Sequence, residues 1–342
     1  MSFKREGEVI LDTTSPKKTL KIQSYRQLGL VAFIVIICIA IQFRNSRFLT
    51  VSNLLDLLTD DAILCILSVG MMSVILTGAI DLSIGSTIAL SGMTTALCVS
   101  KVQTLHPLVC ILIGCAVGFL CGAVNGFLVA KCAVPPFIAT LGMMDIFRGL
   151  TYVISGGRWV SAYQMPESFK AIGTAKVADV HVYILIAIVV FAVAYYFFSY
   201  SRTGRKIYAV GSNQLSARIT GINTAKISWL VYIIMGTLAG LCGVLWVSKY
   251  ASAQGDTATG EEMSAIAACV LGGVGITGGS GKISGLILGA VFIGILNNAL
   301  PIIHVSTFWQ NFIEGAIILI AVLMNFAVKR HSERATLRRR KI

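Results

Sequence analysis

Three charged side chains lie inside long apolar stretches of this 342-residue sequence, where ionised groups are rare. Asp145 and Arg148 are three positions apart, so they share one helix face and can pair, and Glu314 lies in a later stretch. A charge in hydrocarbon costs about 3 kcal/mol or more, which makes such residues candidates for function. A structural ion pair between Asp145 and Arg148 is the first interpretation. A place for all three on a translocation pathway or gate is the second.

Asp81 stands directly before an apolar stretch that begins at Leu82 and Ser83. A carboxylate in this position accepts hydrogen bonds from the free N–H groups of the first helical turn and faces the positive end of the helix dipole. We therefore expect Asp81 to cap a helix, with a role in gating as the alternative.

The sequence holds no pattern typical of an enzyme or a metal site. The four histidines fall in loops or tails, the nine cysteines lie in or beside apolar stretches, and no CxxC pair occurs. The run GGSGKIS around Lys282 departs from a phosphate-binding loop, because Ile276 and Ile283 stand where that motif requires Gly and Ser or Thr. We expect a tight turn there, no catalytic residue and no cofactor, so energy for transport must come from another chain.

A polar segment at 201–226 mixes basic residues with aromatic and aliphatic side chains, and glycines divide it into short pieces. A merely solvated loop needs no such pattern, so we interpret the segment as a docking surface for a soluble partner. The residues expected on this surface are Arg205, Tyr208, Gly211, Asn213, Arg218 and Gly221.

A second polar segment, at 250–262, is acidic instead. It carries Asp256, Glu261 and Glu262. Such an acidic edge suits basic residues on a partner at the opposite side of the membrane. Acidic residues in exposed loops also serve solubility alone, and this alternative stays open.

Helices that cross a membrane must position these residues. Of the sequence, 56% is hydrophobic and only 13% is charged, and the apolar residues come in blocks of about 18–22, the length that a helix needs to span hydrocarbon. A barrel would alternate polar and apolar residues, whereas runs such as 184–198 are apolar on every face. The sequence therefore predicts an all-α, polytopic integral membrane protein. About ten transmembrane helices are expected, at 29–43, 62–78, 82–99, 108–130, 137–154, 182–199, 227–246, 263–276, 283–300 and 307–327.

The net charge of +13 has a positional explanation that requires no nucleic acid. With the N-terminus inside, 20 Lys and Arg residues fall in cytoplasmic segments and 7 fall outside, the bias that orients proteins of the cytoplasmic (inner) membrane. Both termini are thus expected in the cytoplasm, as a polar tail at 1–28 and a basic tail at 329–342 around a transmembrane domain at 29–328. The first tail lacks the apolar core and cleavage site of a secretory signal.

The sequence also looks internally duplicated. A short span, a glycine-rich turn and a span rich in Gly and Ser occupy 62–99, and a similar order occupies 263–300. Five spans would precede the end of each half, and because five is odd, the second half would be inverted relative to the first. We therefore expect two inverted five-helix halves.

Several motifs together resemble one family. They are MMSVILTGAIDLSIGSTIALSG at 71–92, PFIATLGMMDIFRGL at 136–150, IYAVGSN at 207–213, GEEMSAIAACVLGGVGITGGSGK at 260–282 and GILNNAL at 294–300. In this order they resemble the permease subunits of carbohydrate-uptake ABC importers of the ribose, xylose, galactose and autoinducer branch, with ribose permeases the most similar.

The resemblance implies an assembly: a second permease copy (a homodimer) or a close paralogue, a cytoplasmic ABC ATPase subunit that engages the loop after the sixth span, and an extracytoplasmic sugar-binding protein. Its cargo would be a monosaccharide such as ribose, although Glu314 departs from the ribose branch. The residues that match the family's motifs are Asp81, Ser83, Gly85, Thr140, Arg148, Tyr208, Gly211, Asn213, Glu262, Gly272, Gly273, Asn297 and Asn298.

A second hypothesis from the residues is a stand-alone carrier for a small polar solute, driven by H⁺ or Na⁺. The charged residues within spans and the inverted repeat favour it. The docking surface at 201–226 argues against it, because a carrier that works alone needs no such surface.

Overall fold

The computed structural model describes residues 16–306, 308–310, 312–313, 315–317, 319–320 and 323, so Glu314 lies outside the described residues. The predicted all-α fold class is confirmed: the described part of the chain forms twelve α-helices, a short 3₁₀ helix at Ala162–Gln164, and a two-stranded ribbon of β1 (Lys176–Val177) and β2 (Val180–His181). The helices are α1 (Pro16–Arg44), α2 (Val51–Ile75), α3 (Ile84–Lys101), α4 (Pro107–Ala130), α5 (Pro136–Ser155), α6 (Glu167–Thr174), α7 (Val182–Tyr200), α8 (Arg202–Ser212), α9 (Gln214–Ile219), α10 (Thr224–Tyr250), α11 (Glu261–Leu271) and α12 (Ile283–Ile302).

Seven helices among the described residues are long and apolar enough to cross a membrane, so the chain is a polytopic membrane protein. The segment predicted as a span at 263–276 differs, because α11 has only 11 residues. At 1.5 Å per residue it covers about 16 Å, roughly half of the hydrocarbon thickness. The seven segments are Gln27–Arg44, Val51–Ile75, Pro107–Ala130, Pro136–Ser155, Val182–Tyr200, Thr224–Tyr250 and Ile283–Ile302.

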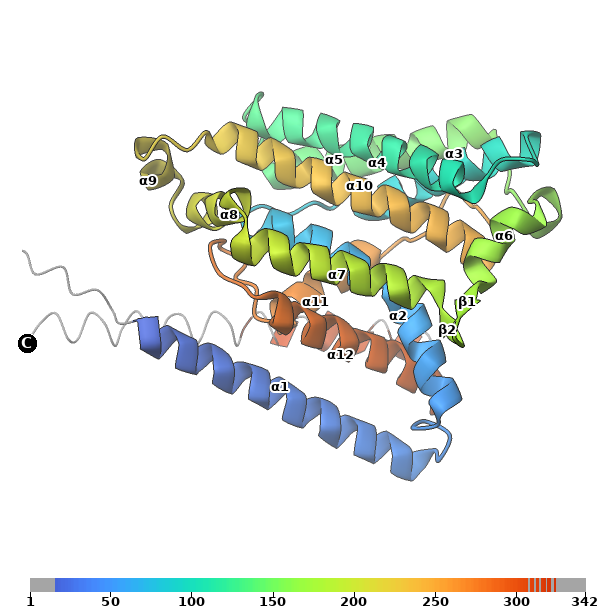
Figure 1. Ribbon diagram of the computed structural model, residues 1–342, viewed down its shortest axis with the longest axis horizontal. Helices are drawn as coiled ribbons and strands as arrows, with labels where there is room; N and C mark the ends of the chain where they lie inside the picture. The colour runs from blue at the N-terminus through green and yellow to red at the C-terminus, as the bar shows by residue number, and fades with distance from the viewer. Residues whose placement is uncertain are drawn as a thin grey trace, which may run out of the picture.

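Two helices, α2 and α10, lie in the middle of the bundle. α10 packs on α4, α3 and α2, while α2 also contacts α12, α7 and α11. Figure 1 shows α8 and α9 at one end of the bundle and α6 with the β1–β2 ribbon at the other. We call these the α8 end and the α6 end.

Close packing between α4 and α10 depends on glycines spaced four residues apart. A Cβ added at Gly118 would overlap the carbonyl oxygen of Gly236, and one added at Gly236 would overlap that of Gly118. Small residues with this spacing let two helix backbones touch, which is a main source of helix association in membranes. The glycines are Gly114, Gly118, Gly122 and Gly126 on α4, and Gly236 and Gly240 on α10.

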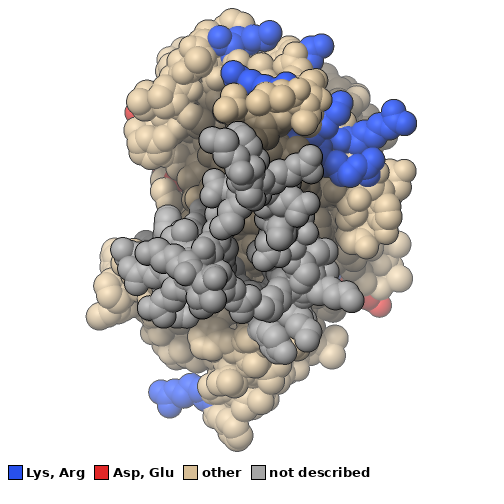
Figure 2. Space-filling view, turned by 90° about the vertical axis from the view of Figure 1, so that its left-hand side faces the viewer, with Lys and Arg blue, Asp and Glu red and all other residues tan. Residues whose placement is uncertain are grey.

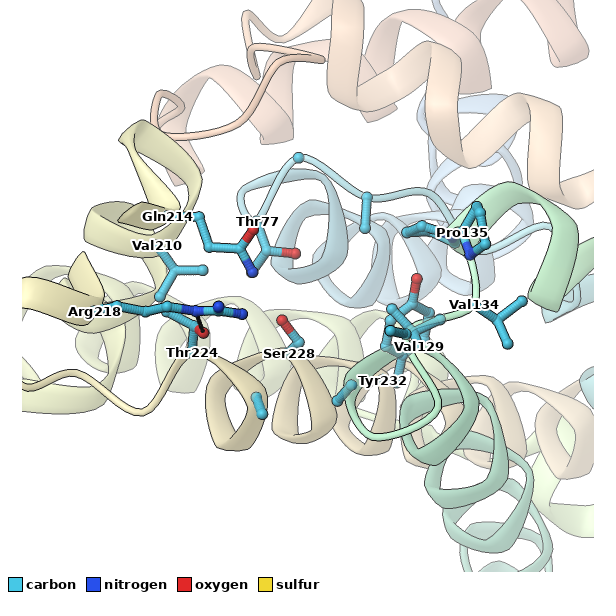
Figure 3. A pocket seen from close by; sticks show the side chains of 16 residues that line it. Thr77, Val129, Val134, Pro135, Val210, Gln214, Arg218, Thr224, Ser228 and Tyr232 are labelled. Carbon is cyan, nitrogen blue, oxygen red and sulfur yellow. Dashed lines mark hydrogen bonds between the residues drawn. The ribbon is translucent and has the colours of Figure 1, made fainter. Parts of the chain in front are cut away.

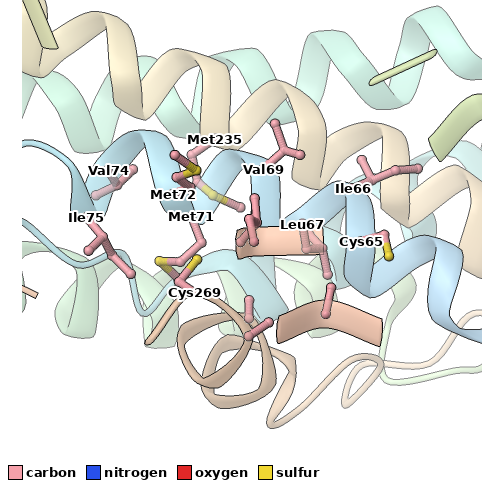
Figure 4. Packing of buried hydrophobic residues seen from close by; sticks show 14 of the residues in the cluster. Cys65, Ile66, Leu67, Val69, Met71, Met72, Val74, Ile75, Met235 and Cys269 are labelled. Atoms are coloured by element: carbon pink, nitrogen blue, oxygen red, sulfur yellow. The ribbon is translucent and has the colours of Figure 1, made fainter. Parts of the chain in front are cut away.

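The core is centred on α2, whose stretch from Ala62 to Ile75 is buried and surrounded by other helices. Figure 4 shows Met71 and Met72 of α2 beside Met235 of α10 and Cys269 of α11. Unbranched methionine side chains fill the irregular gaps between these three helices. The half-length helix α11 is thereby held against the centre of the bundle.

Candidate functional site

The chain turns back into the bundle after α2, over residues 76–83, and α3 begins inside. The buried Asp81 carboxylate accepts hydrogen bonds from the Ser83 backbone N–H at 2.9 Å and from the Ser83 hydroxyl at 2.7 Å. Asn125 of α4 donates to the Ser83 hydroxyl at 2.7 Å. Asp81 lies just before α3, but the predicted cap is wrong: Ser83 is the N-cap residue, and the Asp81 carboxylate bonds Ser83 instead of the N–H groups of the first turn. Asn125 is a third member of the cluster that the sequence did not indicate.

A second segment, residues 251–260, enters the bundle from the α6 end and leads into α11. Ala253 pairs with Val160 at that end, and Ala258 is buried. The two entering segments meet at Gly85, because a Cβ there would lie 2.5 Å from the carbonyl oxygen of Ala258 and 2.7 Å from a carboxylate oxygen of Glu262. The first turns of α3 and α11 therefore touch in the interior.

Arg148 holds the 251–260 segment in place. Its guanidinium donates two hydrogen bonds of 2.8 Å, to the carbonyl oxygens of Gly255 and Thr257. The predicted ion pair with Asp145 is wrong: among the described residues no salt bridge includes Asp145, and its side chain is exposed on α5. The half-buried Arg148 is instead close enough to Glu262 and Asp256 to interact with their charges.

The predicted acidic edge is divided in the structure. Asp256 is exposed, whereas Glu261 and Glu262 form the first turn of α11 and are partly buried. Acidic residues in the first helical turn are stabilised by the positive end of the helix dipole. The three residues therefore do not form one outward-facing surface.

A cavity of about 220 Å³ lies between α2, α10, α11 and α12. It brings together Asn297 and Asn298, which the sequence singled out, and Glu261. Asn298 also exchanges hydrogen bonds with Asn53 at the start of α2. The polar residues on its wall are Asp60, Asp61, Glu261, Asn297 and Asn298, and its aromatic ones are Trp246 and Tyr250.

Asp60 and Asp61 were missed because two adjacent acids predict a loop, and the sequence placed the start of the span at 62. The structure continues α2 through both residues. Asp61 is buried. The Asp60 carboxylate forms a salt bridge with the Lys249 ammonium group of α10, with an O···N distance of 2.6 Å. The two residues are 189 positions apart, so no local sequence pattern predicts this contact.

A larger cavity, of about 380 Å³, opens at the α8 end (Figure 3). Thr77 of the 76–83 segment lines this cavity. Thr140 of α5 is not part of the lining, and its hydroxyl donates a weak hydrogen bond of 3.4 Å to the Ile80 carbonyl oxygen. Arg218 donates to the Thr224 hydroxyl at 3.0 Å at its edge. The side chains labelled in Figure 3 come from the 76–83 segment, α4, the α4–α5 turn and α8 to α10: Thr77, Val129, Val134, Pro135, Val210, Gln214, Arg218, Thr224, Ser228 and Tyr232.

The predicted docking segment forms α8, α9 and their connections. Ser201 and Asn213 cap the two helices by accepting hydrogen bonds from Gly204 N–H and Ser216 N–H, at 2.8 and 2.9 Å. The outer face exposes two aliphatic side chains, Leu215 at 70% and Ile219 at 79%. The exposed basic residues of α8 and α9 are Arg202, Arg205, Lys206 and Arg218, and Figure 2 shows Lys and Arg gathered on this end, with few acidic side chains in view.

The inner face of α8 packs on two glycine-rich turns. A Cβ at Gly211 would overlap the carbonyl oxygen of Leu76, which accepts a hydrogen bond of 2.9 Å from Gly279 N–H. Tyr208 donates to the Gly281 carbonyl oxygen at 2.9 Å, and burial raises the pKa of Tyr208 to about 12. Gly221 ends the unit in a left-handed conformation (φ 81°).

The turn around Gly279 is the predicted tight turn between two apolar helices. Its glycines adopt positive φ, at 87° for Gly273, 84° for Gly278 and 71° for Gly279, which residues with a Cβ rarely adopt. Gly272 packs on the backbone of Gly285 in α12. Glycine is thus required here for backbone geometry and for close contact.

A helical bundle with several membrane-crossing helices, two segments that enter it from opposite ends and polar cavities at different depths defines a membrane transport protein. Residues 53–322 match the family described as the branched-chain amino acid transport system/permease component. The chain belongs to this family, and it is therefore a permease component rather than an enzyme.

Its relatives confirm the resemblance to carbohydrate importer permeases. The chain is 40% identical over 301 residues to the ribose import permease protein RbsC of Escherichia coli K12, covering 87% of this chain and 93% of the relative. It is 36% identical to the Bacillus subtilis RbsC, covering 88% and 92%. It is 35% identical to the D-allose transport system permease protein AlsC of Escherichia coli K12, covering 86% and 90%. No solved structure matches the chain significantly.

Proposed function

We propose that this chain is the permease subunit of an ATP-driven importer that moves a monosaccharide, ribose or a similar sugar, across the cytoplasmic membrane. The names of its relatives support the cargo. The observation that carries the proposal is the surface of α8 and α9, which exposes Leu215 and Ile219 together with four basic residues of the same two helices. An apolar centre with a charged rim is typical of a protein–protein interface.

The partner at this face is a cytoplasmic ABC ATPase subunit. Gly211 joins α8 to the end of α2 and to the turn before α12. Closure of the ATPase dimer would shift α8, and α8 would move both turns together as a rigid body, a common form of switching. The sequence lacks a phosphate-binding loop, so the energy must enter through such a contact.

A second permease copy would cover the outer face of α5. Asp145 is exposed there within a helix fit to cross the membrane, and lipid is an expensive environment for a carboxylate. A Cβ at Gly142 or Gly149 would meet nothing within 4 Å, so both glycines leave room for a close approach. We propose that α5 forms the interface of a homodimer, where Asp145 is shielded from lipid.

An extracytoplasmic sugar-binding protein would dock at the α6 end. Trp159 and Tyr163 are 62% and 84% exposed near α6, and aromatic residues are enriched in interfaces. Asp256 is the acidic residue of the 250–262 segment that is exposed enough to meet basic residues of this partner.

Ten membrane segments in two inverted halves remain our proposal, with a different pairing. The expected match of 62–99 with 263–300 fails, because α2 and α11 both lead toward the α8 end, at Leu76 and Gly279, and are not inverted. α10 leads the opposite way, from Thr224 to the Lys249–Asp60 contact. The proposed pairs are therefore α2 with α10 and α3 with α11.

In the orientation that we propose, both termini and the α8 end face the cytoplasm. Single cysteines at the exposed positions Ser168 on α6 and Ser216 on α9, in a cysteine-free variant, would test it with a membrane-impermeant maleimide. We expect Ser168→Cys to react from outside and Ser216→Cys only after the cells are opened. The reverse pattern would refute this orientation.

The docking face is tested by charge reversal. We expect Arg205→Glu combined with Arg218→Glu to abolish ATPase co-purification and ATP-dependent uptake of D-ribose in proteoliposomes, while the exposed positions change stability by about 0.5 kcal/mol or less. Arg158→Glu, exposed near α6, is the matched control for ATPase co-purification. Sugar accumulation driven by a pH gradient, with no ATPase present, would overturn the proposed function.

A further inference from the structure

The 220 Å³ cavity between α2, α10, α11 and α12 contains a carboxylate without adequate partners. Asp61 is only 4% exposed, and its Oδ1 atom has no hydrogen-bond partner among the described residues. Its Oδ2 atom accepts one weak hydrogen bond, from the Cys65 thiol at 3.4 Å. Burying a carboxylate without partners is costly, so an Asp at this position indicates that a partner from outside the chain fills the gap.

The packing around Asp61 is shaped to accept its side chain. Gly294 of α12 faces it directly, and a Cβ at Gly294 would overlap the carboxylate. Glycine there leaves room for Asp61 while keeping α12 close to α2. The carboxylate is thus built into the wall of the cavity and does not result from a loosely packed helix end.

The other walls offer amides and an aromatic surface. Asn297 is exposed to the cavity side of α12 and provides both a donor and an acceptor. Trp246 and Tyr250 lie one helical turn apart on α10, with ring centroids 5.1 Å apart. Glu261 at the start of α11 contributes a further acceptor and connects the cavity to the place where α3 and α11 meet.

The side chains that line the cavity determine which chemical class of ligand it can bind. Several carboxylates repel an anion, and in the described part of the chain no three His, Cys, Asp or Glu side chains converge as metal ligands do. Hydroxyl groups donate to carboxylates and both donate to and accept from amides, while the C–H face of a ring packs on an aromatic side chain. A neutral ring that carries several hydroxyl groups can bond the carboxylates and amides and pack on the aromatic side chains at the same time.

We propose that this cavity is a monosaccharide-binding subsite of the permease itself, in which a sugar hydroxyl donates to Oδ1 of Asp61. The proposal rests on the proposed function as a sugar importer and adds to it. A permease with this subsite binds its cargo on the way through, after release from the external binding protein. Asn297 orients the sugar from α12, and Trp246 supports its ring from α10.

The first test is binding to the purified permease without its partners. Intrinsic tryptophan fluorescence is recorded while D-ribose or D-allose is added, with gluconate as an anionic control. We expect saturable quenching by at least one sugar, about tenfold weaker binding in Asp61→Ala, as for the loss of one hydrogen bond to a charged group, and loss of the quenching in Trp246→Phe. Asp56→Asn, exposed on α2, should match the wild type.

The second test measures uptake with the ATPase and the binding protein present, so that the two proposals fail separately. We expect Asp61→Ala and Asn297→Ala to lower sugar uptake about tenfold at unchanged ATPase co-purification, which also shows that the variants fold. If the wild type transports no sugar, the proposed function fails. If it transports sugar and both variants equal Asp56→Asn, only the subsite fails. If uptake by the wild type depends on H⁺ or Na⁺, and Asp61→Asn removes this dependence while sugar binding is unchanged, the cavity binds an ion and the proposed subsite is overturned.

Discussion

The contact between α4 and α10 makes a quantitative prediction about Gly118. Replacing it by Ala places a methyl group against the Gly236 carbonyl oxygen and within 2.7 Å of the Gly240 backbone. Ordinary contacts of a Cβ atom lie at 3.4–4 Å, so the two backbones must separate by roughly 1 Å, and the contacts on either side loosen with them. Overpacking of this kind costs about 1–3 kcal/mol.

A matched control removes the effect of helix propensity. Gly29 lies in α1, and a Cβ there would meet nothing within 4 Å. Gly29→Ala should therefore gain up to about 1 kcal/mol, because Ala favours a helix and restricts the unfolded chain. Gly118→Ala should gain the same amount and lose the overpacking cost, which leaves the two variants about 1–3 kcal/mol apart.

Thermal unfolding in detergent, followed by size-exclusion chromatography of a fluorescent fusion, measures the difference. We expect the midpoint temperature of Gly118→Ala to fall below that of the wild type and that of Gly29→Ala to equal or exceed it. Equal midpoints for the two variants would refute the argument that backbone contact between α4 and α10 requires glycine.

Three further predictions follow from single contacts. Arg148→Gln should lower the free energy of unfolding by about 2–3 kcal/mol, because two hydrogen bonds from a charged group are lost. Adding Asp145→Asn should not restore stability, whereas it would if the two residues formed an ion pair. Thermal unfolding of the single and double variants measures both effects. Tyr208→Phe should cost about 1 kcal/mol at pH 8. Since the pKa of Tyr208 is raised to about 12, above its ordinary ~10, this stabilisation is full below about pH 10 and is lost as the pH rises through 12, and the variant should lack that alkaline dependence. Gly85→Ala should separate α3 from the 251–260 segment and slow uptake at normal expression, whereas unchanged uptake would show that the close contact is not needed for transport.

The sequence predicted the fold class well, because a helix that crosses hydrocarbon needs a long apolar block, and this requirement is visible residue by residue. α4, α5, α7 and α12 begin and end within a few residues of the predicted spans. A span was predicted to start at 62, whereas α2 starts at Val51, because the acidic pair Asp60 and Asp61 interrupts the apolar block by which a span is predicted. Their partners, Lys249 and the cavity, come from distant segments and leave no local pattern.

Helix length and helix direction were the weaker points. The apolar run at 263–276 matches a buried half helix as well as a short span, because hydropathy does not distinguish protein from lipid as the surroundings. Similar glycine-rich turns led to the pairing of 62–99 with 263–300, although the turns resemble each other because both must pack against Gly211, not because the helices are inverted copies. The four-residue glycine spacing of α4 is visible in the sequence and indicates a close helix contact, but it does not identify α10 as the partner.

The partner of Arg148 illustrates a different limit. Spacing along a helix predicts which side chains can meet, and Asp145 satisfied that rule. The guanidinium instead satisfies two backbone carbonyls of an irregular segment more than a hundred positions away. Such carbonyls lack helical partners and need a donor, but only the tertiary structure shows which donor reaches them.

The meeting of α3 and α11 at Gly85 has an electrical consequence for a membrane that maintains a potential. Each helix directs its N-terminus inward, and each N-terminus carries about half an elementary positive charge. Asp81 balances one of these poles, and Glu261 and Glu262 balance the other. Opposite charges are therefore adjacent where α3 and α11 meet, so neither helix N-terminus presents an uncompensated positive charge to the interior of the membrane.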